Sequence, residues 1–550
     1  MLGSSIDVLL RFPIVVLGMA AILGETTKAK RQKMWTTVAT VGVALGDVDG
    51  ETLLRIREQN DSLSRLGMQV LMWVSYSQRP LQIDELCHAL AVEIRSTDLN
   101  LDNAPSIDTV LDSCLGLVII DKNSTLHLIH HSLREYLSSQ SIFPRAHQTL
   151  AETCLTCLNF SEVNNISSGC ASDLPYTSFL KYSSIYWGIH AKGNLSDRAK
   201  SLAVELLSRN DNHISATLLF QHIVDGRNDN NACGYLLFQY LEDDHPDIFH
   251  HQFTGLHRAS YFGIVEVVKA LVEMKGSDIN QGDCIGCTPL MWAAQRGNEG
   301  VVRILLARGD VDPDKSDNHG GTPLSGASSE GHEGIVRQLL ARESVNPNKP
   351  DNSGGTPLKG ASCYGHEGVV RLLLARGDVN PNVTESHGGT PLWWASCVGY
   401  EGVVRLLLAR SDVNPDQANH RGETPLWCAS SEDTEGHEEV VRLLLARSDV
   451  NPDQANYRGE SPLWRASSEG NEGVVRILLA RRDVNPDRPD NCGRTPLALA
   501  ASRGYVSVVK LLLARPDVNP GTPDDQGQTP LQVASTNGHR KIVALLKPRI

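Results

Sequence analysis

Apolar and polar positions in the second half of the chain repeat with one period. A Thr-Pro-Leu motif, or a close variant, recurs at a spacing of 34 residues, with one spacing of 37. A short apolar stretch follows each motif, and a run such as Gly-Val-Val-Arg-Leu-Leu-Leu-Ala-Arg comes next. Each unit therefore predicts two short helices, and the repetition predicts a solenoid whose units bury one another's apolar faces. The nine units start at Thr254, Thr288, Thr322, Thr356, Thr390, Thr424, Ser461, Thr495 and Thr529.

The unit that starts at Thr390 shows how the elements form. A threonine side chain can cap a helix N-terminus, and Pro391 suits the first helical position. Leu392 and Ala395 share one apolar face, and Gly399 ends the first helix. The longer spacing after Thr424 reflects three extra residues, which we place beside the turn between the two helices.

These motifs resemble the ankyrin repeat. The resemblance rests on T-P-L-x-x-A, G-x-x-x-V-V-x-L-L-L and D-V-N, and it covers residues 250–550. It implies a protein-binding concave face, lined by the two positions after T-P-L and by the loop tips. The histidine that often follows T-P-L in the family is present only as His257, so the hydrogen bonds that it makes between repeats are in doubt.

Tryptophans gather at the two variable positions after T-P-L. Three of them are equivalent in successive units, so we expect a ladder of indoles there. They either pack between repeats in place of histidine, or form an aromatic surface that binds a protein. The candidate partner-binding residues are Trp292, Trp393, Trp394, Trp427, Trp464 and Arg465.

Arginines also recur, inside the second helix of each unit and at its end. The terminal set, such as Arg376 and Arg410, lies close in sequence to Asp378 and Asp412. Cations at a helix C-terminus are favourable, and we expect a solvated ion-pair face. A phosphate-binding stripe is the alternative.

Residues 51–145 alternate helical and strand-like patterns. Two helices flank a turn at Arg79–Pro80, and residues 107–114 are helical. Two short strands surround a turn at residues 122–124, and a helix opens at Ser132. Three helices with a hairpin form a winged-helix pattern, but it lacks the basic recognition helix of a DNA-binding domain.

The segments RPLQIDELCHAL and LGLVIIDKNSTLHLIHHSLREYL resemble a GPI inositol-deacylase-type winged helix. Such a domain follows the NACHT nucleotide-binding module of fungal NLR-like (STAND) receptors. The resemblance implies that His130 is the counterpart of a nucleotide-sensing histidine if such a module is present. Otherwise His130 and His131 are structural groups of a small core.

The flanking segments complete the organisation. Residues 146–250 are similar to the helical connector of the same receptors, and Phe179, Tyr182, Tyr186 and His190 share one face, as in a core stripe. Residues 1–50 are interpreted as a remnant of a nucleotide-binding module. The apolar run at residues 8–23 is too short for a confident membrane helix and lacks a basic start, so a buried helix is favoured.

Several kinds of chemistry are disfavoured. The net charge of −13 argues against nucleic-acid and anionic-membrane binding. No Gly-Lys pair and no G-x-S-x-G motif occur, so the chain itself has neither a phosphate loop nor a lipase nucleophile elbow. The pairs Cys154/Cys157 and Cys284/Cys287 are too far apart in sequence for a zinc site, and the cysteines suit a reduced, cytoplasmic protein. We expect no enzyme activity, cofactor or metal.

The sequence therefore predicts a mainly α protein with four parts. These are a possible module remnant (1–50), a winged-helix domain (51–145), a helical connector (146–250) and nine ankyrin repeats (251–550). The predicted function is the protein-binding, regulatory part of a fungal NLR-like receptor. A standalone ankyrin adaptor without a nucleotide switch is the alternative.

Overall fold

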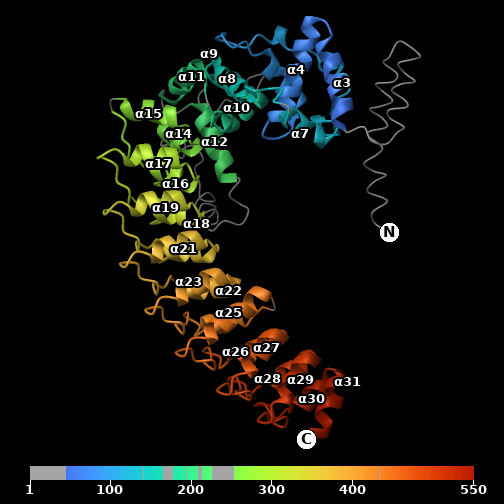
Figure 1. The fold of residues 1–550 in the computed structure, drawn as a ribbon, viewed down its shortest axis with the longest axis vertical. Coiled ribbons are helices and arrows are strands. Elements are labelled where there is room, and N and C mark those ends of the chain that lie inside the picture. The colour runs from blue at the N-terminus through green and yellow to red at the C-terminus, as the bar shows by residue number, and fades with distance from the viewer. Residues whose placement is uncertain are drawn as a thin grey trace, which may run out of the picture. The chain divides into compact units, whose positions relative to one another are not determined.

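The computed structural model describes residues 45–139, 141–164, 177–193, 195–208, 213–225, 253–274, 276–432 and 434–549. The chain divides into two compact units, one up to Ser277 and the other from Asp278 (Figure 1). The predicted remnant at residues 1–50 and the apolar run at residues 8–23 lie largely or wholly outside the described residues.

The first unit begins with helices around a small antiparallel sheet. The strands β1 (Leu81–Gln82), β2 (Val118–Ile120) and β3 (Thr125–Leu128) lie in the order β1-β3-β2. The hairpin that the sequence predicts is present, and the Asp121 carboxylate shapes its turn by accepting hydrogen bonds from the backbone N–H groups of Asn123 and Thr125. Strand β1 was not predicted because two residues carry no periodicity. The helices are α3 (Leu45–Arg57), α4 (Asp61–Tyr76), α5 (Ile83–Ala91), η1 (Leu101–Asn103), α6 (Ile107–Ser113) and α7 (His131–Ser139).

A bundle of further helices packs on this domain. The predicted core stripe is confirmed for Phe179, Tyr182 and His190, which are at most 2% exposed, whereas Tyr186 is half-buried. Trp73 of α4 packs edge-on against Phe179 and Tyr182, with ring centroids 5.8 and 6.1 Å apart. The helices are α8 (Ala146–Leu158), α9 (Ser161–Asn164), α10 (Thr177–His190), α11 (Asp197–Ser208), α12 (Ile214–Asp225), α14 (Gly255–Phe262) and α15 (Val265–Glu273).

A chain of partly buried hydrogen bonds joins the segment after α4 to this bundle. The backbone N–H of Gln78 donates to the Tyr182 hydroxyl over 3.2 Å, and that hydroxyl lies 3.0 Å from Nε2 of His190. Nδ1 of His190 lies 2.9 Å from Nδ1 of His147. Two neutral imidazoles satisfy all three contacts, because Tyr182 then donates to His190, which donates to His147. Burial, followed by the proximity of His147, lowers the pKa of His190 to about 3.

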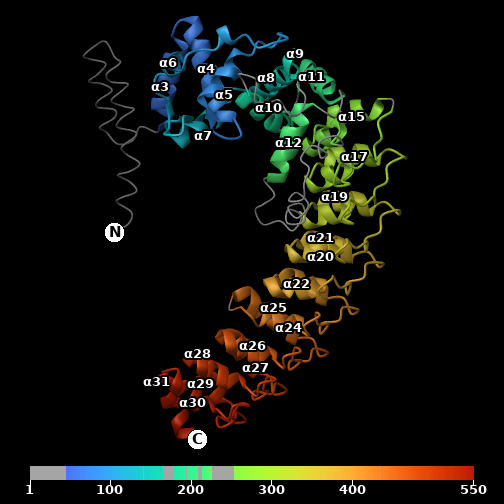
Figure 2. The ribbon, with the colours of Figure 1, turned by 180° about the vertical axis from the view of Figure 1, so that it is seen from behind.

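The second unit is an array of helix pairs, and its connecting loops all project to one side (Figure 1, Figure 2). The extra residues after Thr424 lie beside the turn, as the sequence predicts: α24 ends at Ala429, α25 begins at Glu435, and α25 is extended at its N-terminus. The first helices are α16 (Pro289–Gln295), α18 (Pro323–Ser329), α20 (Pro357–Cys363), α22 (Pro391–Val398), α24 (Pro425–Ala429), α26 (Pro462–Glu469), α28 (Pro496–Arg503) and α30 (Pro530–Thr536). The second helices are α17 (Glu299–Leu306), α19 (Glu333–Leu340), α21 (Glu367–Leu374), α23 (Glu401–Leu408), α25 (Glu435–Leu445), α27 (Glu472–Leu479), α29 (Val506–Ala514) and α31 (Arg540–Leu546), with η4 (Lys547–Arg549) at the end.

Two separate constraints require glycine at the position that ends a first helix. Gly399 adopts the left-handed conformation with φ of 82°, which a residue with a side chain rarely adopts. A Cβ at this position would also lie 2.9 Å from the His437 ring of the next repeat. His437 Nε2 in turn lies 3.0 Å from the carbonyl oxygen of Cys397, at the end of α22.

Histidines before the second helices therefore supply bonds between repeats. His332, His366 and His539 make the same contact to the preceding repeat, over 3.1, 2.9 and 2.9 Å. The histidines that are missing after T-P-L left the hydrogen bonds between repeats in doubt. Histidines at a different position of the repeat make such bonds instead. His257, the residue at the family position, contacts the capping Thr254 of its own helix.

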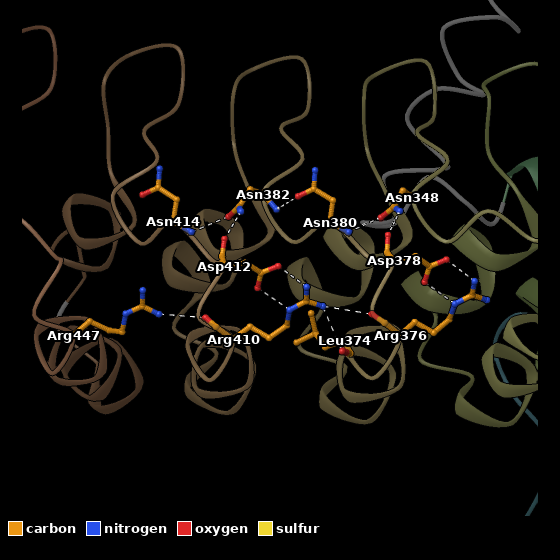
Figure 3. A network of polar contacts seen from close by, with 10 residues as sticks. All are labelled: Asn348, Leu374, Arg376, Asp378, Asn380, Asn382, Arg410, Asp412, Asn414 and Arg447. Carbon is orange, nitrogen blue, oxygen red and sulfur yellow. Dashed lines mark hydrogen bonds and ion pairs between the residues drawn. The ribbon is translucent and has the colours of Figure 1, made fainter.

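The arginine that ends each second helix joins two repeats. Arg410 pairs with both carboxylate oxygens of Asp412, and its Nη1 donates to the carbonyl oxygens of Leu374 and Arg376 in the preceding repeat (Figure 3). Arg447 donates to the carbonyl oxygen of Arg410 over 3.3 Å. The predicted ion pairs are confirmed, and five of these arginines also donate to a C-terminal carbonyl of the preceding second helix: Arg376, Arg410, Arg447, Arg481 and Arg515.

A second row of contacts runs through the loops. Asn382 Nδ2 donates to the carbonyl oxygen of Asp412 over 2.6 Å, and its Oδ1 accepts from the N–H of Asn414 (Figure 3). At the equivalent position, Asp453 Oδ2 accepts from the N–H of Asn485, but its buried Oδ1 has no partner among the described residues. By the register of the repeat this oxygen corresponds to the amide nitrogen of Asn382. Burial raises the pKa of Asp453, because removal from water disfavours the charged carboxylate.

Acid should loosen the joint between α8 and α10. His190 has a folded-state pKa below its ordinary value, so its contribution to stability is present above about pH 6.5 and is lost as the pH falls toward its folded pKa. The loss is about 2 kcal/mol by pH 5 for one such histidine. Hydrogen exchange of residues 146–158 and 177–190 should accelerate at pH 5 relative to pH 7.5 after correction for intrinsic rates. Residues 462–479 serve as an internal control, and an equal acceleration there would contradict the prediction. His190→Gln should reduce the pH dependence.

Replacing Asp453 by Asn should stabilise the array at pH 7. The amide supplies the missing donor and removes a partly buried charge, for a gain of about 1 kcal/mol. The folded-state pKa of Asp453 is raised, so its destabilising effect appears as the pH rises through that pKa and the gain should shrink toward pH 4. Urea unfolding followed by circular dichroism measures both. The reverse variant Asn382→Asp should lower the free energy of unfolding. If Asp453→Asn and Asn382→Asp changed that free energy in the same direction, the loop contact would not depend on protonation.

Candidate functional site

The first turns of α22, α24 and α26 carry the candidate tryptophans. Each turn is fixed by a capping hydroxyl, as when Thr390 Oγ1 accepts from the N–H of Trp393 over 3.1 Å. Trp393 and Trp394 are both half-buried, and their rings meet edge to face with centroids 5.1 Å apart. They form the one indole pair among the described residues for which such a ring contact is resolved.

The two indoles of this pair have different surroundings. Trp393 Nε1 donates to the carbonyl oxygen of Glu423 in the next repeat over 3.0 Å, so this indole bonds between repeats. Trp394 Nε1 has no acceptor among the described residues. The Lys359 ammonium lies 4.8 Å from the centroid of the Trp394 ring, a cation–π distance. Trp394 therefore keeps part of its ring surface exposed, whereas its indole nitrogen is buried.

Trp292 does not belong to this surface. It is 1% exposed, and its Nε1 donates to Asp283 over 2.8 Å. The expectation that Trp292 contacts a partner is corrected, because neighbouring side chains already bury its indole and an acceptor occupies its one donor.

The predicted ladder of indoles is not formed in the described array, since no ring contact joins Trp393, Trp427 and Trp464 there, and arginine side chains pack on the last two. Trp427 is 8% exposed, and the Arg465 guanidinium lies 4.9 Å from its ring centroid. Trp464 is 5% exposed, with Arg494 at 5.8 Å. These two indoles pack in the array. Arg465, which also pairs with Glu469 over 2.9 Å, is the half-buried group above them.

The sequence analysis missed Lys359 and Arg494 as parts of this face. Lys359 stands in the repeat before Trp394, and Arg494 stands in the loop after Trp464. The sequence signal that could have revealed them is a positive residue at a variable position one repeat away from an indole. The pattern within a single unit does not show this pairing of a cation with an indole in a neighbouring unit.

The structure also joins Cys397 and Cys428 by a disulfide, with Cα atoms 4.9 Å apart. The sequence analysis treated the cysteines as thiols. Cys397 ends α22 and Cys428 lies in α24, so stacking brings together residues that are 31 apart in sequence. The bond ties the helix that carries the Trp393–Trp394 pair to the following repeat.

The remaining candidates lie elsewhere. Cys154 and Cys157 are fully buried within α8, and burial raises the pKa of Cys154 to about 12. Cys284 is half-buried and Cys287 is buried in a loop of the second unit. The described side chains contain no cluster of three groups suited to a metal ion. His130 is half-buried between β3 and α7.

Two parts of the chain match known protein families. Residues 256–351, 327–417 and 392–490 match the family described as ankyrin repeats (3 copies), and residues 478–534 match ankyrin repeats (many copies). Residues 256–534 are ankyrin repeats. Residues 54–147 match the winged helix domain of GPI inositol-deacylase. Both resemblances noted in the sequence are thereby confirmed, and no curated protein matches the chain.

The ankyrin assignment identifies the first-helix face as a surface of a protein-interaction module. Ankyrin stacking explains why Val403 and Leu407 of α23 are fully buried while the positions after Thr-Pro-Leu differ from unit to unit. In the described part of the chain, no helix is both long enough and apolar enough to cross a membrane.

The ankyrin array should respond differently to two truncations. Leu407→Ala removes a fully buried side chain and should cost about 2–5 kcal/mol, whereas Trp394→Ala should cost about 1 kcal/mol through its edge contact and cation–π contact. Urea unfolding followed by circular dichroism gives both values. A loss for Trp394→Ala as large as that for Leu407→Ala would identify the indole as core.

Proposed function

We propose that this chain is a non-catalytic binding protein whose ankyrin array engages a protein partner on its concave face. The supporting observation is the Trp393–Trp394 pair, because both rings are half-buried and keep part of their surface exposed. Partly exposed aromatic side chains are typical anchors of protein interfaces. Trp393, Trp394 and Arg465 are the proposed contacts, and Trp427 and Trp464 support them from within the array.

The winged helix suggests a regulatory setting for this binding. We propose that the chain acts as the recognition part of an NLR-like receptor of fungal type in the cytoplasm, with a nucleotide-binding module upstream or on a separate chain. The support is the order of a GPI inositol-deacylase-type winged helix, a helical bundle and ankyrin repeats. Partner binding would then shift a two-state module between closed and open forms.

An enzyme is the weaker alternative. The described side chains offer no metal cluster, and the sequence lacks a phosphate loop and a lipase nucleophile elbow. The winged helix shares only a domain description with GPI inositol-deacylase, and a fold does not fix an activity.

Selection from a random peptide library displayed on phage tests the binding proposal. The full chain is immobilised, and we expect enriched peptides whose affinity falls at least tenfold on Trp394→Ala. Arg371→Ala is the matched control, because Arg371 is exposed on α21 and lies outside the proposed contacts. Enrichment that survives Trp394→Ala unchanged would contradict the proposed face.

The receptor setting has its own test. Sequencing the transcript upstream of the Met1 codon should reveal an in-frame Gly-Lys-Ser or Gly-Lys-Thr phosphate loop. A transcript that starts without one, in a host with no separate NACHT partner gene, would leave the standalone ankyrin adaptor.

A further inference from the structure

Three successive loop tips lie side by side at residues 386–388, 420–422 and 457–459. The N–H of His420 donates to the carbonyl oxygen of His387 over 2.9 Å, and the N–H of Tyr457 donates to that of Arg421 over 3.0 Å. Backbone hydrogen bonds therefore hold the three tips in register. We call the surface formed by His387, His420, Arg421, Tyr457 and Arg458 the tip ledge.

The tip ledge departs from the structural rule of the other tips. In three of the other tips an asparagine side chain donates to the preceding tip, as Asn318, Asn352 and Asn491 do over 3.1, 3.0 and 2.9 Å. At the equivalent positions the ledge carries His420 and Tyr457. Replacing a structural donor by an exposed ring sacrifices a stabilising bond, and such departures concentrate at functional sites.

The rings of the ledge are exposed and yet positioned. Tyr457 is 75% exposed, the largest value among the exposed large hydrophobic side chains of the described residues. Its ring lies over Gly422 of the previous tip, where a Cβ would come within 2.9 Å of it. The His420 ring lies over Gly388 in the same way, with a separation of 2.7 Å. Packing on glycine backbone limits ring motion and lowers the entropy cost of binding.

The ledge also presents cations outward. Arg421 and Arg458 are exposed, and neither forms an ion pair with a carboxylate among the described residues. The neighbouring acids are held within the loops, since Asn419 and Asn456 each donate to a Glu423 or Glu460 oxygen over 2.8 Å. The tips at 284–286, 318–320, 352–354, 491–493 and 525–527 carry no arginine.

We propose that the tip ledge docks an acidic segment of a protein partner, with carboxylates on Arg421 and Arg458 and an apolar group on Tyr457. Charge complementarity argues for this occupant, because the ledge offers free guanidinium groups on a chain whose net charge is −13. The inference rests on the proposed protein-binding function and names the chemistry of the partner. The half-buried Trp393–Trp394 pair follows the His387 tip in the chain, so one bound segment can reach both surfaces. Five residues before Trp394, a Cβ at Gly389 would contact both indoles and Glu385.

Fluorescence anisotropy with the full chain tests the ledge. The probe is a fluorescein-labelled peptide of alternating Glu and Leu, compared with the same peptide carrying Gln in place of Glu. We expect the Glu peptide to bind at least tenfold more tightly at low salt. The double variant R421Q/R458Q should remove most of that difference. The matched control R303Q/R337Q neutralises two exposed arginines of α17 and α19 and should leave it unchanged.

A further variant separates binding from folding. Tyr457→Asn introduces the asparagine of the other tips, so it should preserve the urea midpoint while weakening the Glu peptide about fivefold or more. Equal binding of the Glu and Gln peptides, or an equal effect of the two arginine pairs, would overturn the ledge. Binding of a phosphoserine peptide without binding of the Glu peptide would also overturn it. If the binding of library peptides depends on Trp394 but the peptides lack acidic residues, the ledge proposal alone is refuted. If no library peptide depends on Trp394 for binding, the proposed function is refuted.

Discussion

The array depends on hydrogen bonds that one repeat cannot make alone. Helices of about two turns leave a large share of their terminal carbonyl groups without an internal partner. His437 contacts the last carbonyl region of α22, and Arg410 donates to the carbonyls that end α21. Each repeat is thus completed by side chains of the following one. The apolar stacking of residues such as Leu407 supplies the main driving force, while these polar contacts set the register between neighbours.

This arrangement explains which positions vary along the array. A residue that satisfies a neighbour's carbonyl cannot change without leaving a buried polar group unpaired. The glycine before most second helices is equally constrained, since Gly399 has a positive φ and a ring of the next repeat beside it. Variation is frequent at positions without these constraints, such as Trp394, Arg421 and Arg458. Asp453 and Tyr457 are instructive exceptions, because each gives up a bond that asparagine makes in other repeats.

The first unit uses a different device to join its parts. A histidine pair, of which His190 is buried, and a tyrosine hydroxyl link the end of α4 to α8 and α10. Arg79 adds a bidentate ion pair with the buried Glu85 and lies 5.4 Å from the Tyr182 ring centroid. The hydrogen bonds of this joint require a specific geometry, and their strength depends on the protonation of the histidines. The aromatic packing of Trp73 does not depend on protonation. A regulatory role for the winged helix would be compatible with a joint of this kind.

The sequence alone determined the repeat, most of its helix boundaries and the winged-helix elements other than β1, because these follow from local periodicity, capping residues and glycine positions. Thr390, Pro391 and Gly399 specify a helix within one unit, and no distant contact is needed to read them. The tertiary structure alone decided which candidate residues share a surface. It buried Trp292 against Asp283, placed cations over Trp427 and Trp464, joined Cys397 to Cys428, and aligned Arg421, Tyr457 and Arg458. Those outcomes depend on how residues of adjacent repeats meet when the helices stack, and spacing along the chain does not encode that geometry.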